Sequence, residues 1–310
     1  MTDETVLSSP SIGYQILLFV IIQAWALMTY ETAQYQLLLI FETPLNWILW
    51  SIMLMGTLAP VVYAIVWRAK QQVTVGSLEW NHRDRDVTLD EYREMTNQYA
   101  RDYQYMISRV DFGFLLLSLM AGVILVLAPF LLMRTNALLI SLAPATSGLA
   151  MLIFAVLLLI TIFRAAPSSV SDQFPYHPPR QLARANRSLV DIPGVSWVGV
   201  RLVIGESEGL YTLRSPRPVM RVEDIEGIAR IECEIDRTGR LESAAAIIER
   251  YDGDDEYIDS LDSPITRLGL TKLVRVLLVT YIDERGDEAG ILGEIVEEVD
   301  RAIASMVREE

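Results

Sequence analysis

Long apolar runs constrain this chain more strongly than any other feature of its sequence. Four of them, at residues 12–30, 45–67, 112–133 and about 138–163, contain no charged residue. Each is long enough to cross a hydrocarbon core, about 30 Å thick, as an α-helix. Because a backbone in lipid must satisfy its own hydrogen bonds, a span of this length is helical. The sequence therefore predicts an α-helical membrane bundle of four transmembrane helices.

The distribution of Arg and Lys predicts the orientation of this bundle. The segment between the first two spans has no basic residue, and the turn between the last two has only Arg134. Since basic residues accumulate on the inner side, we expect both termini in the cytoplasm and the protein in the plasma membrane, the cytoplasmic membrane of a prokaryote. Residues 1–11 lack the basic start of a signal peptide, so the first span is expected to be retained. The basic residues on the predicted inner side are Arg68, Lys70, Arg83, Arg85, Arg93, Arg101, Arg109 and Arg164.

The stretch from Thr88 to Met133 predicts one helix that is longer than the membrane is thick. Thr88 and Glu91 have the spacing of a capping box, and no proline follows until Pro129. An unbroken helix from Leu89 to Met133 would be about 67 Å long. Only about 30 Å of it fits the hydrocarbon core, so the rest is predicted to form a cytoplasmic stalk.

The stalk carries a stripe of apolar and aromatic residues at spacings of three and four, which is typical of a coiled coil. Two interpretations remain open for this stripe. It packs against the C-terminal domain of the same chain, or it docks another chain through Tyr92, Tyr99, Tyr103 and Met106. Tyrosine suits an interface because its ring is apolar and its hydroxyl takes a polar partner. The stripe consists of Leu89, Tyr92, Thr96, Tyr99, Tyr103, Met106 and Val110.

Two pairs of small residues are predicted to let the transmembrane helices approach closely. Ser118 and Gly122 lie four residues apart in the third span, and Ala143 and Ser147 have the same spacing in the fourth. Small residues at this spacing are typical of helix–helix contacts in membranes.

The segments between and after the spans complete the predicted organisation. A cytoplasmic connector and the stalk occupy residues 68–110, between transmembrane helices at 12–67 and at 111–164. Residues 165–194 contain five prolines and are predicted to form an extended linker. In it, Arg180, Arg184 and Arg187 form a small basic face that either contacts anionic lipid head groups or is simply solvated.

Residues 195–310 are predicted to fold as a small, acidic α+β cytoplasmic domain. Apolar residues alternate with polar ones at 198–204 and 231–235, which indicates half-buried strands, and 273–282 is also expected to be a strand. An amphipathic helix follows at 291–306 and is expected to cover the sheet. The domain has 26 acidic and 14 basic residues, hence −12 of the chain's net charge of −14. Such a charge disfavours a nucleic-acid partner.

Residues that could carry out chemistry are scarce. Cys233 is the single cysteine, and neither His82 nor His177 has a neighbouring nucleophile motif. Glycine-rich phosphate-binding loops are missing from the sequence. An acidic cluster at residues 252–262 lacks the glycine and final glutamate of a calcium-binding loop. We therefore expect no catalytic residue, cofactor site or metal site.

These observations favour a non-enzymatic membrane subunit or scaffold. Its stalk and cytoplasmic domain would assemble a complex in the lipid bilayer, either as a homo-oligomer or with other membrane subunits. Two alternatives stay open: a channel or transporter subunit with a regulatory cytoplasmic domain, and a membrane-anchored sensor.

Overall fold

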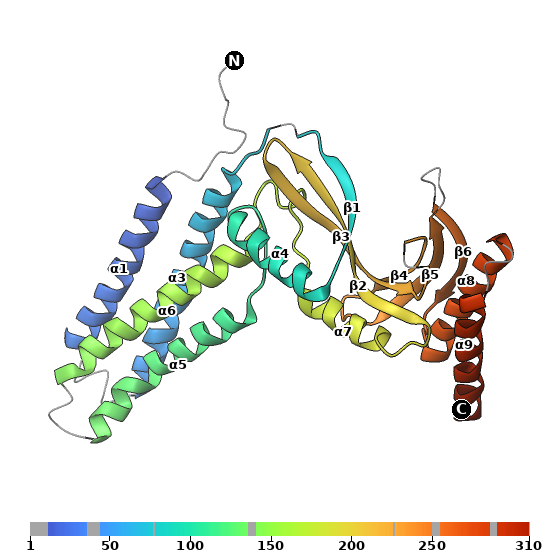
Figure 1. Ribbon diagram of the computed structural model, residues 1–310. Helices are drawn as coiled ribbons and strands as arrows, with labels where there is room; N and C mark the ends of the chain where they lie inside the picture. Colours follow the sequence, from blue (N-terminus) through green and yellow to red (C-terminus); the bar gives the residue numbers. More distant parts are fainter. Residues whose placement is uncertain are drawn as a thin grey trace, which may run out of the picture. The chain divides into compact units, whose positions relative to one another are not determined.

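The computed structural model describes residues 12–35, 44–76, 78–135, 141–225, 227–249, 255–285 and 290–309 (Figure 1). The chain forms two compact units. Met1–Leu78 and Tyr103–Pro175 make up the first, called the membrane unit below, and Glu79–Asp102 with Tyr176–Glu310 make up the second, the sheet unit. The chain therefore passes from one unit to the other three times.

The membrane unit contains four helices, α1 (Ile12–Tyr35), α3 (Pro44–Gln71), α5 (Phe112–Thr135) and α6 (Ala143–Ala165). Three of them, α1, α3 and α6, are long and apolar enough to cross a membrane. The described side chains of α5 form a shorter apolar helix, Phe112–Leu127. All four contribute to one core, which includes Ile22, Leu58, Leu125 and Met151. The predicted turn around Asn136 lies outside the described residues, as do residues 36–43 between the first two spans.

The predicted continuous helix from Leu89 to Met133 is wrong. Helix α4 (Leu89–Asp102) ends in a turn at residues 103–106, and α5 begins only at Phe112. The start of α5 is capped, because Asp111 Oδ1 accepts the Gly113 N–H at 3.1 Å. Tyr103, Met106 and Ile107 are buried around the break. Burial of these apolar side chains and the new cap both favour two helices over one.

The sheet unit is built on six antiparallel strands that follow one another in sheet order β1 to β6 (Figure 1). Strand β1 comes from the predicted connector and pairs along its whole length with β2, for example Asp86 with Arg201. The strands are β1 (Asn81–Val87), β2 (Val195–Ser207), β3 (Leu210–Val222), β4 (Ala229–Ile235), β5 (Leu241–Glu249) and β6 (Asp255–Asp262).

The structure confirms the predicted antiparallel sheet domain. Helix α8 (Arg267–Arg285) packs against β5 and β6, and α9 (Gly290–Glu309) packs against α8 and adds Ile295 and Val299 to the same core. The strand predicted at 273–282 is wrong, because these residues belong to α8. A short apolar run does not distinguish a strand from a buried helix, and here burial recurs every three or four residues. The buried residues are Leu270, Leu273, Val274, Leu277, Leu278 and Tyr281.

The extended linker predicted at 165–194 is also wrong in its second half. Helix α7 (Pro179–Leu189) begins with proline at its first position, where the missing N–H costs nothing. It is strongly amphipathic and buries Leu182, Ala185 and Leu189. The helix contacts α4 and strands β2, β3 and β4 within the sheet unit. The prolines that suggested a linker therefore start a packed helix.

Candidate functional site: the charged face of the sheet

The four residues of the stripe that were predicted as a partner interface, Tyr92, Tyr99, Tyr103 and Met106, are buried within the chain. Tyr92 and Tyr99 on α4 lie in the sheet unit, where the Tyr92 hydroxyl donates to the His177 carbonyl at 3.2 Å. The Tyr99 ring centroid lies 5.7 Å from that of Tyr211 on β3. Burial raises the pKa of Tyr92 above its ordinary value and lowers that of His177. Both tyrosines therefore pack as the intramolecular interpretation expects.

Tyr103 and Met106 are placed in the membrane unit instead. The Tyr103 ring centroid lies 5.0 Å from that of Phe174, and the Ser168 hydroxyl donates to the Met106 carbonyl at 2.6 Å. The break between α4 and α5 thus divides the stripe, so that it does not form one coiled-coil seam.

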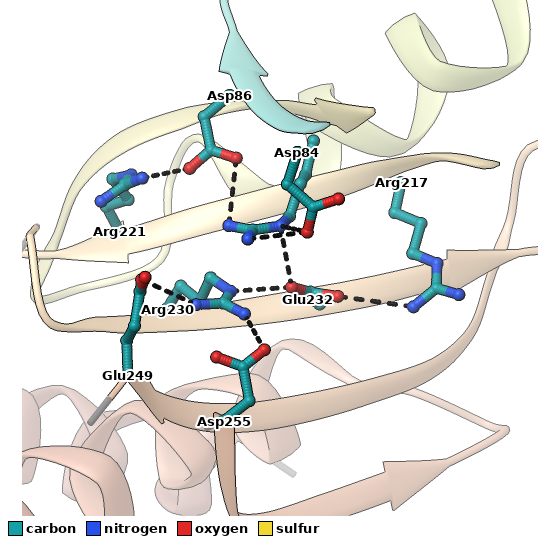
Figure 2. Close-up of polar contacts among 9 residues, drawn as sticks. Asp84, Asp86, Arg217, Arg221, Arg230, Glu232, Glu249 and Asp255 are labelled. Carbon is teal, nitrogen blue, oxygen red and sulfur yellow. Dashed lines mark hydrogen bonds and ion pairs between the residues drawn. The ribbon is translucent and has the colours of Figure 1, made fainter. Parts of the chain in front are cut away.

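The densest polar arrangement of the sheet unit is a network of nine arginine and acidic side chains (Figure 2). It extends across the sheet from β1 to β6, on the face opposite the core residues Ile231 and Cys233 of β4. We call this surface the charged face. Its members are Asp84, Asp86, Arg201, Arg217, Arg221, Arg230, Glu232, Glu249 and Asp255.

Arg230 is the most deeply buried member, with 3% of its side chain exposed. Its Nε lies 2.7 Å from Glu232 Oε1 and its Nη1 3.2 Å from Glu249 Oε2, while Nη2 bonds Asp255 (Figure 2). Burial alone would lower the pKa of Arg230, but its hydrogen bonds and the charges of Glu232 and Asp255 raise it. The guanidinium therefore stays charged and fastens β4 to β5 and β6.

Arg201 on β2 fastens the other side of the sheet. Its guanidinium contacts Asp84 at 3.0 Å and Asp86 at 3.3 Å on β1, and Glu232 at 3.4 Å on β4. Asp86 also pairs with Arg221 of β3 (Figure 2). A segment that precedes α5 is thereby joined by charge to strands that follow α6.

The acidic and basic side chains of the charged face are paired with one another. Each carboxylate lies within ion-pair distance of at least one guanidinium, which suits a structural role better than that of a general base. Cys233 lies behind this face, where burial, followed by the charge of Glu232, raises the pKa of its thiol to about 12. A thiol with such a pKa is a poor nucleophile at neutral pH. The arrangement is suited to holding strands together.

A second polar cluster lies in the membrane unit, where α3, α5 and α6 end or begin. Lys70 is fully buried and donates to the carbonyls of Ile107 at 3.1 Å and Ala166 at 2.8 Å, with its ammonium 5.0 Å from the Phe163 ring. Asp111, in the same loop as Ile107, forms an ion pair with Arg164 at 2.8 Å.

The surroundings of Asp111 favour its charged form. Burial opposes ionisation, but the backbone N–H groups of Gly113 and Phe114, together with Arg109 and Arg164, lower the pKa of this carboxyl below its ordinary value. Asp111 therefore links the loop before α5 to the end of α6.

The predicted helix-packing residues are all buried in the bundle. A Cβ at Gly122 would lie 3.1 Å from Met55 Sδ and 3.5 Å from Phe154, so this glycine allows α5 to approach α3 and α6. Ser118 and Ser147 donate to carbonyls of their own helices, and Ala143 is fully buried. Gly148, which the spacing of small residues does not single out, also packs closely, because an added Cβ would lie 3.1 Å from Tyr30 Cβ on α1.

Arg180, Arg184 and Arg187 lie exposed on α7. Arg184 Nη1 approaches the Thr238 carbonyl at 3.4 Å, in the turn between β4 and β5. Their spacing places the three arginines on one side of α7, as the predicted basic face requires.

The sequence analysis also missed the charged face. Its signal is the alternation of charge at 82–86 (His-Arg-Asp-Arg-Asp) and at 230–234 (Arg-Ile-Glu-Cys-Glu), where every second residue points to the same side of a strand. The second segment was interpreted only through its apolar residues, and the first lay in a predicted connector.

The described residues include no group of three or more His, Cys, Asp or Glu side chains that could hold a metal ion. Asp252 and Asp254 of the acidic cluster lie outside them. Comparison of the chain with protein-family models, with curated proteins and with solved structures finds no match.

Proposed function

We propose that this protein is a non-enzymatic subunit of the plasma membrane that crosses the bilayer four times, with both termini in the cytoplasm. Its sheet unit is a cytoplasmic platform on which a membrane complex assembles, with further copies of the chain or with other subunits.

The observation that carries the fourth crossing is the pairing of β1 with β2. Strand β1 precedes α5 and strand β2 follows α6, yet both belong to one sheet. Two strands of one sheet lie on the same side of a membrane, so the chain between them crosses an even number of times. If α6 crosses, α5 must cross as well. This supports four crossings, although the described part of α5 is short.

The design of the sheet unit supports a role as a platform. The charged face joins β1 to the later strands, so that the unit is built from both sides of the α5–α6 hairpin. A domain attached to membrane helices by three chain connections is suited to presenting a surface at the membrane. Because the tyrosine stripe is buried, the contact surface for partners lies on other parts of the domain.

A channel or transporter receives less support. Hydroxyls that could line a polar path, those of Thr57, Ser118 and Thr161, donate to carbonyls of their own helices at 2.8–2.9 Å. The four predicted spans also contain no charged residue, whereas ion relays place ionisable side chains inside the membrane.

Native mass spectrometry of the full chain, extracted from membranes in mild detergent, tests the proposal. We expect a stoichiometric assembly heavier than the 35.0 kDa monomer. A stable monomer without any co-purifying chain would contradict it. Ion flux through vesicles containing the purified protein would instead favour a channel.

A further inference from the structure

A cavity of about 620 Å³ lies in the sheet unit, away from the charged face. Three separate segments form it: α7, the turn between β4 and β5, and the segment that leads from β6 into α8. A volume of this size is typical of sites for small ligands. Its lining residues include Arg184, Ser188, Arg240, Ser263, Thr266 and Arg267.

Ion pairs neutralise the three arginines of this cavity only in part, because the charge of Arg240 acts on the neighbouring carboxylate of Asp236. Among the residues that the structure describes, Arg184 and Arg267 have only backbone carbonyls as partners, those of Thr238 and Asp191. The members of the charged face, by contrast, are all paired (Figure 2). In a domain with a net charge of −12, a cavity lined by three arginines, two of which have only backbone carbonyls as partners among the described residues, favours an anionic ligand.

Two carboxylates also line the cavity, but one of them is already engaged. Asp236 accepts the N–H groups of Thr238 at 2.7 Å and Arg240 at 2.9 Å, and these bonds, led by that of Arg240, lower its pKa. The turn that they form carries Arg240 to the cavity. Glu242 is the second carboxylate and lies exposed, and the three arginines still outnumber the two acids.

The fold holds the positions of these arginines. Gly239 has φ +80°, and a Cβ there would lie 2.7 Å from the Gln181 carbonyl of α7, so the turn packs directly on the helix that carries Arg184. Thr266 accepts the Gly269 N–H at 3.1 Å and caps α8 next to Arg267. The hydroxyls of Ser263 and Thr266 add further polar groups, while that of Ser188 already donates to the Ala185 carbonyl at 2.6 Å.

We propose that this cavity binds a phosphate-bearing ligand through Arg184, Arg240 and Arg267. Guanidinium groups bind phosphate with paired N–H donors, which suits three arginines around one small cavity. The phosphate group belongs to a soluble phosphate ester or to a lipid head group. The site goes beyond the proposed platform role, because it would let the sheet unit respond to a ligand.

The test measures the melting temperature of the full-length protein in nanodiscs of phosphatidylcholine, with pyrophosphate as the probe. We expect pyrophosphate to raise the melting temperature. Arg240→Gln and Arg267→Gln should each weaken pyrophosphate binding about tenfold or more, since a hydrogen bond to a charged group contributes about 1.5–3 kcal/mol. Arg187→Gln, on the same helix as Arg184 but outside the cavity, should bind as the wild type does.

A second variant and a second membrane complete the design. Glu242→Gln removes the exposed carboxylate and should strengthen binding, an effect that misfolding could not produce. Nanodiscs that contain phosphatidic acid test the lipid source: stabilisation there that the arginine substitutions abolish identifies a head group, whereas stabilisation only by pyrophosphate identifies a soluble ligand. If neither probe stabilises the protein in a way that depends on Arg240 and Arg267, the proposal is wrong.

Discussion

At the scale of single residues, the sheet unit depends on buried charges whose partners are far away in the sequence. Arg230 meets Glu249 and Asp255, 19 and 25 residues away, and Arg201 meets Asp84 and Asp86, more than 100 residues away. Alternation in a strand predicts which side chains share a face, but it does not predict which strands are neighbours. The sequence could therefore reveal the charged residues of β4 without revealing their pairing.

Arg230→Met should destabilise the sheet unit by about 3 kcal/mol, because it removes a buried cation and leaves Glu232, Glu249 and Asp255 with fewer partners. Thermal unfolding of the full chain, followed by the fluorescence of its six tryptophans, measures the loss. The matched change Arg217→Met affects a guanidinium with 44% exposure and should cost less than about 1 kcal/mol. Equal effects of the two substitutions would contradict a structural role for the charged face.

Cys233 should react with iodoacetamide at pH 8 only when the sheet unit unfolds. Its pKa, raised from 9.0 to about 12, keeps the thiol protonated in the folded protein, while the unfolded chain loses this proton above pH 9. The raised pKa therefore contributes stability below pH 9 that is lost as the pH rises toward about 12. Labelling rates with and without denaturant check this. Fast labelling of the folded protein would show that the thiol is accessible.

At the scale of elements, the start of α4 was predicted correctly from the sequence, whereas its end was not. The predicted capping residues Thr88 and Glu91 lie at the start of α4, where the Thr88 hydroxyl accepts the Glu91 N–H at 3.2 Å. No comparable sequence signal marked the break after Asp102. The break depends on tertiary contacts of Tyr103 and Met106, which a local pattern does not contain.

Tyr92→Ala should destabilise the sheet unit by about 3 kcal/mol, since it empties a fully buried site on α4. Because Tyr92 packs within its own chain, the folded fraction of the variant should form assemblies of the same mass as the wild-type protein does. Light scattering combined with thermal unfolding separates the two effects. Dissociation of an assembly without loss of stability would restore the stripe as a partner interface.

Gly122→Val should destabilise the helix bundle by about 1–3 kcal/mol, because its Cβ would press on Met55 and Phe154. Gly56→Val is the matched control, since nothing lies within 4 Å of a Cβ at that position. Melting temperatures in the same detergent compare the variants. A lower melting temperature for Gly56→Val than for Gly122→Val would contradict the close approach of α5 to α3 and α6.

At the scale of the whole molecule, hydrophobic length predicted the membrane helices, and alternation predicted an antiparallel sheet after them. The sequence did not reveal that residues 79–102 complete this sheet, because β1 is short, charged and has almost no apolar alternation. That strand nevertheless gives the strongest support for the proposed topology, since it brings both flanks of the α5–α6 hairpin into one sheet.

Cysteine accessibility tests this topology most directly. In a Cys233→Ser background, single cysteines replace His82 on β1, Asn136 in the predicted outer turn and Ser305 on α9, and whole cells are treated with a maleimide that does not cross membranes. The four-crossing account predicts that only Asn136→Cys is labelled in intact cells and that all three are labelled after permeabilisation. Labelling of His82→Cys and Ser305→Cys from opposite sides, or of Asn136→Cys from their side, would contradict it.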